Sequence, residues 1–61
     1  MRVQYTTGYS VEYKRVNKET MQAVWRDNRG HQVDYELIPL AWLDGFRKDA
    51  RTSPIVKSVI E

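Results

Sequence analysis

Cysteine is absent from this 61-residue chain, and its absence excludes several classes of protein. Without thiols the chain has no disulfide framework, no thiolate nucleophile and no cysteine-ligated zinc. Small secreted domains usually depend on disulfides, so we expect a cytoplasmic protein. The chain also lacks an apolar run of about 20 residues and an apolar signal segment at its N-terminus, so we expect no contact with a membrane.

Residues that carry catalytic chemistry are equally scarce. There is a single histidine, His31, and there is no glycine-rich phosphate loop, nucleophile elbow or histidine pair at helical spacing. Asp34 and Glu36, with His31 just upstream, could bind a metal or relay a proton. A solvated strand face beside a polar turn explains the same residues, and so small a domain has few side chains to orient metal ligands. We expect neither an enzyme nor a cofactor or metal site.

The sequence does contain regular alternation of apolar and polar residues, which is typical of strands with one buried face. Residues 1–15 alternate, but they exceed a typical strand, so either a bulge or a tight hairpin turn is expected at Gly8. Further strands are predicted at 20–26 and 33–37, with turns at 17–18 and 27–30.

After Pro39 the period changes from that of a strand to that of a helix. Residues 39–51 place Trp42, Leu43 and Phe46 on one apolar arc, and we expect these three side chains to be structural. The tail at 54–60 could form a short helix after Ser-Pro, but its β-branched residues favour a strand. The fold class predicted is α+β: one domain over 1–61, a small antiparallel meander of three or four strands with one helix packed on one face.

The order of these features resembles the KTSC domain family. The residues that carry the resemblance are Met21 to Trp25, Asn28-Arg29-Gly30, Val33, Tyr35, Ile38-Pro39, the helix to Ala50, Ser53 and Ile60. The resemblance covers residues 9–61, and Arg51-Thr52-Ser53 stands where the family has Lys-Thr-Ser-Cys. It implies a meander followed by a helix and no particular activity.

Charge is distributed unevenly along the chain. Residues 1–33 contain six basic and three acidic residues, whereas residues 34–61 contain four basic and five acidic ones. The basic first half is the basis of an alternative function, the binding of nucleic acid. Its contacts would be Lys14, Arg15, Lys18, Arg26, Arg29 and His31. Successive turns of a meander lie at opposite ends of its sheet, so we expect two separate patches.

Aromatic residues are abundant for so small a chain: four tyrosines, two tryptophans and one phenylalanine. Tyr5, Tyr9 and Tyr13 share one strand parity. They could pack against the helix, form an interface or, as the alternative, stack on bases. We expect more ring surface than the interior can bury. Interfaces are enriched in Trp, Tyr and Arg, and the predicted partner-binding residues are Tyr5, Tyr9, Trp25, Arg26 and Arg29.

These observations together favour a non-catalytic binding module or small regulator that acts through protein–protein contacts. The expected partner is another protein, either a second copy in a homo-oligomer or a larger target that the module inhibits or connects. The sequence identifies neither.

Overall fold

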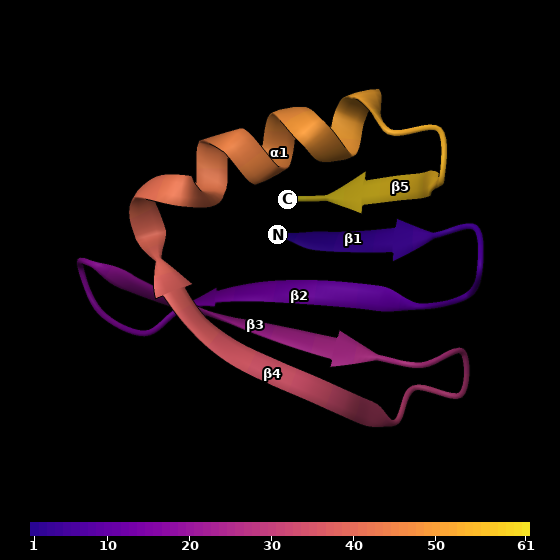
Figure 1. Ribbon diagram of the computed structural model, residues 1–61, viewed down its shortest axis with the longest axis horizontal. Helices are drawn as coiled ribbons and strands as arrows, with labels where there is room; N and C mark the ends of the chain where they lie inside the picture. The colour runs from indigo at the N-terminus through magenta and orange to yellow at the C-terminus, as the bar shows by residue number, and fades with distance from the viewer.

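The computed structural model describes all 61 residues and confirms the α+β fold class. A five-stranded antiparallel sheet carries one helix (Figure 1). Along the chain the elements are β1 (Arg2–Tyr5), β2 (Ser10–Arg15), β3 (Thr20–Arg26), β4 (Gln32–Pro39), a 3-10 turn η1 (Leu40–Trp42), α1 (Leu43–Thr52) and β5 (Val56–Ile60). Across the sheet the strand order is β4-β3-β2-β1-β5. There are more strands than predicted because the first segment forms a hairpin and the tail returns beside β1.

Gly8 turns the first segment back on itself, which decides between the two alternatives left open there. Its φ is +92°, a conformation that favours glycine. The Tyr5 and Tyr9 backbones close the turn, with the Tyr5 N–H donating to the Tyr9 carbonyl at 2.8 Å. Of the three tyrosines with shared parity, Tyr5 therefore lies at the end of β1 and Tyr13 lies in β2, whereas Tyr9 lies in the turn between these strands.

The two other hairpin turns form where the sequence predicts them, and a polar side chain organises each. The Asn17 carboxamide oxygen accepts hydrogen bonds of 2.8 and 2.9 Å from the backbone N–H groups two and three residues later. Asp27 accepts two bonds of 2.9 Å in the same manner, from N–H groups two and four residues later. The hydrogen bond from the His31 N–H is the main reason that the pKa of Asp27 is lowered. Gly30 completes this turn with a φ of +83°.

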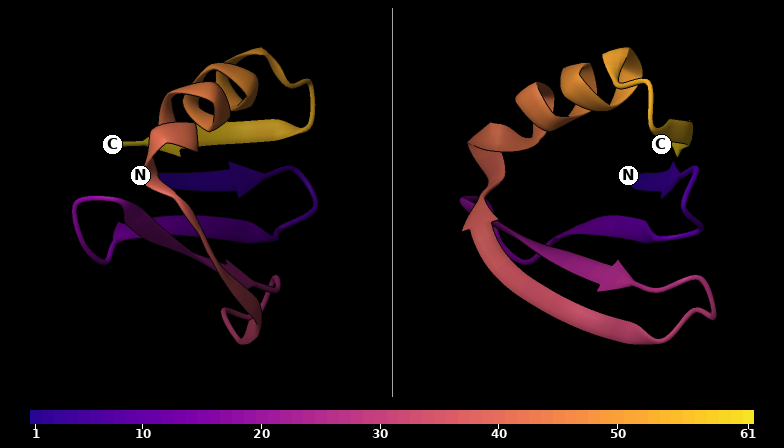
Figure 2. Two further views of the ribbon diagram at one scale, coloured as in Figure 1. Left: turned by 60° about the vertical axis from the view of Figure 1, so that its left-hand side comes forward. Right: turned by 45° about the vertical axis from the view of Figure 1, so that its right-hand side comes forward.

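The helix covers one face of the sheet, which we call the inner face (Figure 2). Val3, Val11, Ala23 and Ala50 form the buried cluster where the helix and the sheet meet. Only seven of the 61 residues are buried, so most side chains retain contact with water. The Tyr13 ring stacks on Phe46 of the helix at 5.3 Å between centroids, which confirms Phe46 as a structural residue.

The prediction that Trp42 is a structural residue is wrong, because 56% of the residue is exposed. The residues from Leu40 to Trp42 form a 3-10 turn, with three residues per turn instead of 3.6. A helical wheel drawn through them therefore misplaces the indole, which lies beside Phe46 edge to face at 6.3 Å. Leu43 is partly buried, as its predicted structural role requires.

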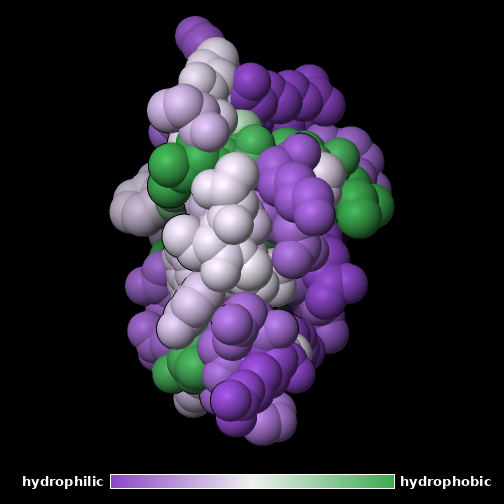
Figure 3. Space-filling view, turned by 90° about the vertical axis from the view of Figure 1, so that its right-hand side faces the viewer, coloured by the Kyte–Doolittle hydropathy of each residue, from purple (hydrophilic) through white to green (hydrophobic).

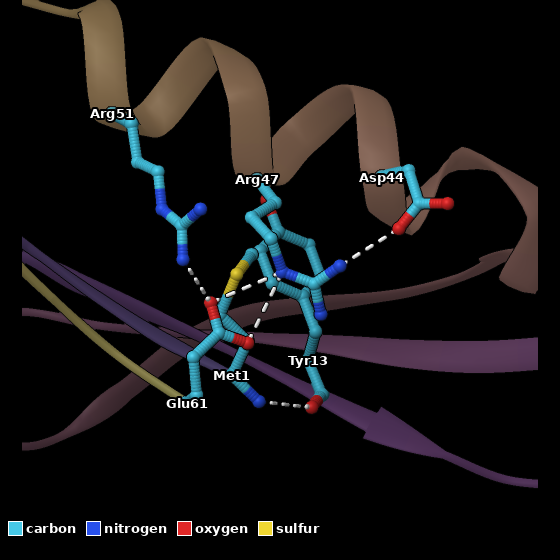
Figure 4. A network of polar contacts seen from close by, with 6 residues as sticks. All are labelled: Met1, Tyr13, Asp44, Arg47, Arg51 and Glu61. Carbon is cyan, nitrogen blue, oxygen red and sulfur yellow. Dashed lines mark hydrogen bonds and ion pairs between the residues drawn. The ribbon is translucent and has the colours of Figure 1, made fainter.

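The tail forms a strand, as favoured from its β-branched residues, and β5 pairs with β1 through Val3 opposite Val59. A charged cluster fastens its end to the helix (Figure 4). The Arg47 guanidinium donates to both carboxylate oxygens of Glu61 at 3.0 and 3.1 Å and to Asp44 at 2.7 Å, while Arg51 also reaches Glu61. The hydrogen bond from Arg47 is the main reason that the pKa of Glu61 is lowered.

Candidate binding surface along the edge strand

Strand β4 is the open edge of the sheet. It is the longest strand, with eight residues, and it lies on the side away from β5 and the body of α1 (Figure 1). Every residue from Gln32 to Leu37 is exposed. The opposite edge, β5, contacts the helix and is tied to it by Glu61. The helix therefore packs beside one edge of the sheet, and no element packs beside the other.

The outer face of β4 carries three exposed apolar side chains, which we call the β4 stripe: Val33, Tyr35 and Leu37. Tyr35 lies opposite Val24, whose chain neighbour Ala23 faces the helix, so Tyr35 and Val24 are on the outer face. The stripe residues are 54%, 57% and 62% exposed in chain order. A single exposed apolar residue is ordinary, but these three follow one another at alternate positions of an edge strand, Val33 at the register shift where Asp34 faces Trp25 and Gln32 faces Arg26.

The backbone of β4 also presents unused hydrogen-bonding groups. The Leu40 N–H donates to the Glu19 carbonyl of the neighbouring chain segment at 2.9 Å. In an antiparallel ladder, inward and outward backbone groups alternate, so Tyr35 and Leu37 point their N–H and C=O groups away from the sheet. Pro39 occupies another outward position, where its missing N–H removes no ladder bond.

Asp34 covers one of these outward donors. Its carboxylate accepts a 2.8 Å hydrogen bond from the Tyr35 N–H. Edge strands are commonly protected from pairing by charged side chains, and this contact is a small instance of such protection. The outward groups of Leu37 have no equivalent cover among the hydrogen bonds of the chain.

The inner side of β4 is acidic and borders an aromatic cluster. In the pairing of β3 with β4, Trp25 faces Asp34 and Ala23 faces Glu36. The Trp25 ring stacks on Tyr5 at 6.0 Å between centroids, with 13° between the planes. Burial is the main cause that raises the pKa of Tyr13 to about 12, and Tyr5 and Glu36 raise it further. Burial likewise raises the pKa of Tyr5.

A cavity of about 230 Å³ lies between the helix and the inner face. Tyr5, Tyr13 and Phe46 form much of its wall, and Asp49 and Ser53 are its polar lining residues. Sites that enclose small molecules usually measure about 300–1,000 Å³. The cavity is therefore a gap beneath the helix that is too small to enclose an ordinary ligand.

The five residues predicted to bind a partner do not form one surface. Tyr5 and Trp25 stack together on the inner face and are partly buried. Arg26 lies on the outer face, paired with Ser10 and Gln32. Arg29 and Tyr9 are exposed in the turns at one end of the sheet, and Figure 3, which looks onto that end, shows hydrophilic residues at the bottom, along the right side and at the top.

The residues proposed for nucleic-acid contacts also separate into two groups, as the meander predicts. Lys14, Arg15 and Lys18 lie around the turn between β2 and β3, and Lys14 pairs with Glu12 at 3.6 Å. The second group, which lies at the other end of β3, comprises Arg26, Arg29 and His31.

The β4 stripe was not singled out from the sequence. Its alternation predicted a strand, and an alternating strand was expected to bury its apolar side chains. The proline at the end of β4 was the available signal, because proline within a sheet is confined to edges and strand ends.

Three observations complete the description of the site. No group of three or more His, Asp or Glu side chains is placed to hold a metal ion, so His31, Asp34 and Glu36 do not converge. No helix of the structure is long and apolar enough to cross a membrane. Comparison with protein-family models, with curated proteins and with solved structures found no match, so the resemblance to the KTSC family stays a prediction.

Proposed function

We propose that this protein is a non-catalytic binding module that adds an extended segment of a partner protein to its edge strand β4. The observation that carries the proposal is the coincidence, on one strand, of outward backbone groups and the exposed β4 stripe. In β-strand addition, backbone hydrogen bonds supply affinity, and alternate side chains supply specificity.

The remaining features of the chain are consistent with this function. Natural sheets normally protect long apolar edges because they invite pairing with other chains. Here β5 contacts the helix and leaves one large apolar side chain, Ile60, exposed, whereas β4 has no element beside it and keeps three in water. The difference between the edges supports a binding role for β4.

Random peptides displayed on phage and selected against the immobilised protein supply ligands for a test. The decisive variant is Leu37→Pro, which removes an outward N–H without removing a bond to β3. We expect selected peptides to shift the amide NMR signals of β4 and to bind Leu37→Pro at least tenfold more weakly. A melting temperature within a few degrees of wild type would show that the variant is folded.

Two further variants separate the strand from exposed aromatic surface in general. Tyr35 and Trp42 are almost equally exposed, at 57% and 56%, but only Tyr35 belongs to the β4 stripe. Tyr35→Ala should weaken peptide binding, and Trp42→Ala should leave it unchanged. The opposite result, with Leu37→Pro binding normally, would contradict the proposal and indicate the helix surface instead.

A further inference from the structure

The two sides of β4 differ in chemistry, and the difference specifies what kind of segment can pair with it. The outer side is apolar, formed by the β4 stripe, whereas the inner side carries Asp34 and Glu36. A strand added to β4 would place its alternate side chains directly opposite these two sets, with Cβ atoms about 4.5–5.5 Å apart. Its own side chains must therefore satisfy an apolar row and an acidic row.

The two carboxylates have no cationic partner within the chain. The ion pairs of the protein join Lys14 to Glu12, and Arg47 and Arg51 to carboxylates at the helix and the C-terminal end. Arg15 lies on the same sheet face by register, but its guanidinium donates to the Asn17 carbonyl at 3.2 Å. A cation that neutralises the acidic row must come from another molecule.

Three symmetric registers of a second copy on β4 bring carboxylates together. Symmetric antiparallel pairing centred on Tyr35 places Asp34 opposite Glu36 of the other copy. Pairing centred on Asp34, or on Glu36, places a carboxylate opposite its own counterpart. Like charges directly opposite one another destabilise a strand pair, so these registers work against self-association.

The aromatic cluster favours a cation on the same side. Trp25 lies next to Asp34 across the strand pair and is partly buried by its stack on Tyr5. Lysine and arginine are attracted both to carboxylates and to the faces of indole rings. In the free protein the Asp34 carboxylate holds the Tyr35 N–H, and a docking strand can take over that donor with its own carbonyl. The carboxylate would then be released to the incoming cation.

We infer that the partner segment of β4 alternates apolar residues with lysine or arginine, apolar on the outer side and basic over Asp34 and Glu36. The inference rests on the proposed edge-strand function and names the class of partner. It distinguishes this chain from a module that pairs with any extended peptide.

Three labelled nine-residue peptides test the inference, each alternating valine with one polar residue: lysine, glutamine or glutamate. Fluorescence anisotropy should show the lysine peptide binding about tenfold more tightly than the glutamine peptide, and the glutamate peptide more weakly than both. The Asp34→Asn, Glu36→Gln double variant should remove the difference between the lysine and glutamine peptides. It keeps an oxygen acceptor beside the Tyr35 N–H, and Asp49→Asn on the helix serves as the matched control, with the difference retained.

The outcomes separate the inference from the function on which it rests. Equal binding of the lysine and glutamine peptides, with both weakened by Leu37→Pro, would overturn the charge inference and leave edge-strand binding intact. Lysine-peptide binding that Leu37→Pro does not change would contradict both. Absence of lysine-peptide binding at millimolar concentration overturns the inference, as does a dimer in sedimentation that Leu37→Pro dissociates.

Discussion

Gly8 is required both by its backbone conformation and by its close packing, and the two effects can be measured separately. Its backbone has a left-handed φ, and a Cβ atom at this position would lie 2.7 Å from the Cβ of Asn28. Gly30 has the same kind of φ, +83°, but open space around it. The turn between β1 and β2 is therefore packed against the turn between β3 and β4, which keeps that end of the sheet together.

We expect Gly8→Ala to lower the free energy of unfolding by about 2–4 kcal/mol, because it adds a steric clash to the backbone strain. Gly30→Ala should lower it by only about 1–2 kcal/mol, from the backbone strain alone. Urea unfolding of both variants measures the difference. Asn28→Gly should recover part of the loss in Gly8→Ala, and a Gly8→Ala variant no less stable than Gly30→Ala would contradict the contact.

Tyr13 provides a prediction at alkaline pH. Its folded pKa is about 12, above the ordinary value of 10.0, because burial disfavours the phenolate. The folded state therefore holds a proton that the unfolded state loses, so the stability linked to Tyr13 is intact below pH 10 and is lost as the pH rises toward 12. Between pH 9 and 11.5 the unfolding midpoint of the Tyr13→Phe variant should fall less steeply than that of the wild type. Equal slopes would show that Tyr13 titrates normally.

The helix is attached at Phe46 rather than at Trp42, and the two aromatic residues should differ in their effect on stability. Phe46 stacks on Tyr13 of the sheet, whereas more than half of Trp42 lies in water. Phe46→Ala should destabilise the protein by about 2–4 kcal/mol and Trp42→Ala by about 1 kcal/mol or less. Thermal melts followed by circular dichroism compare the two variants. A larger loss of stability in Trp42→Ala than in Phe46→Ala would show that the indole attaches the helix instead.

The strands, turns and helix could be predicted from the sequence because each depends on a local pattern of residues. Period-two alternation located the strands, and the polar residues of 17–18 and 27–30 located two turns. The exposure of Trp42 was missed because a short 3-10 turn precedes the helix. A turn of three residues is too short for the sequence periodicity to distinguish it from the first turn of an α-helix. The break at Gly8 was located, but its close approach to Asn28, which is 20 positions away in the chain, leaves no local signal.

The candidate site was less accessible because it depends on the arrangement of the whole sheet. Alternation in β4 reveals which residues share a face but not whether another layer covers that face. The single helix covers the inner face, whereas the apolar side chains of β4 lie on the outer face, where no helix packs, so they remain exposed. The position of β4 at an edge follows only after the tail has taken the other edge beside β1.

The same arrangement limits how the whole molecule can act on nucleic acid. The two basic groups lie at opposite ends of β3, whose seven residues span about 23 Å at about 3.3 Å per residue. This separation exceeds the screening length of about 8–10 Å at ordinary salt, so the groups act independently. Each offers three side chains at most, and Glu12 partly neutralises one group through Lys14.

A ligand held by three phosphate contacts should lose about 20- to 40-fold in affinity between 50 and 200 mM salt. We therefore expect single-stranded RNA and duplex DNA to bind weakly, with a logarithmic salt slope no steeper than about −3. Arg26→Glu combined with Arg29→Glu should remove contacts at one end only, and Lys14→Glu with Lys18→Glu should do so at the other. Anisotropy titrations at several salt concentrations measure the slope. A markedly steeper slope, reduced by both double variants, would mean that one strand of nucleic acid spans both ends of the sheet. That result would favour nucleic acid over an extended peptide as the natural ligand.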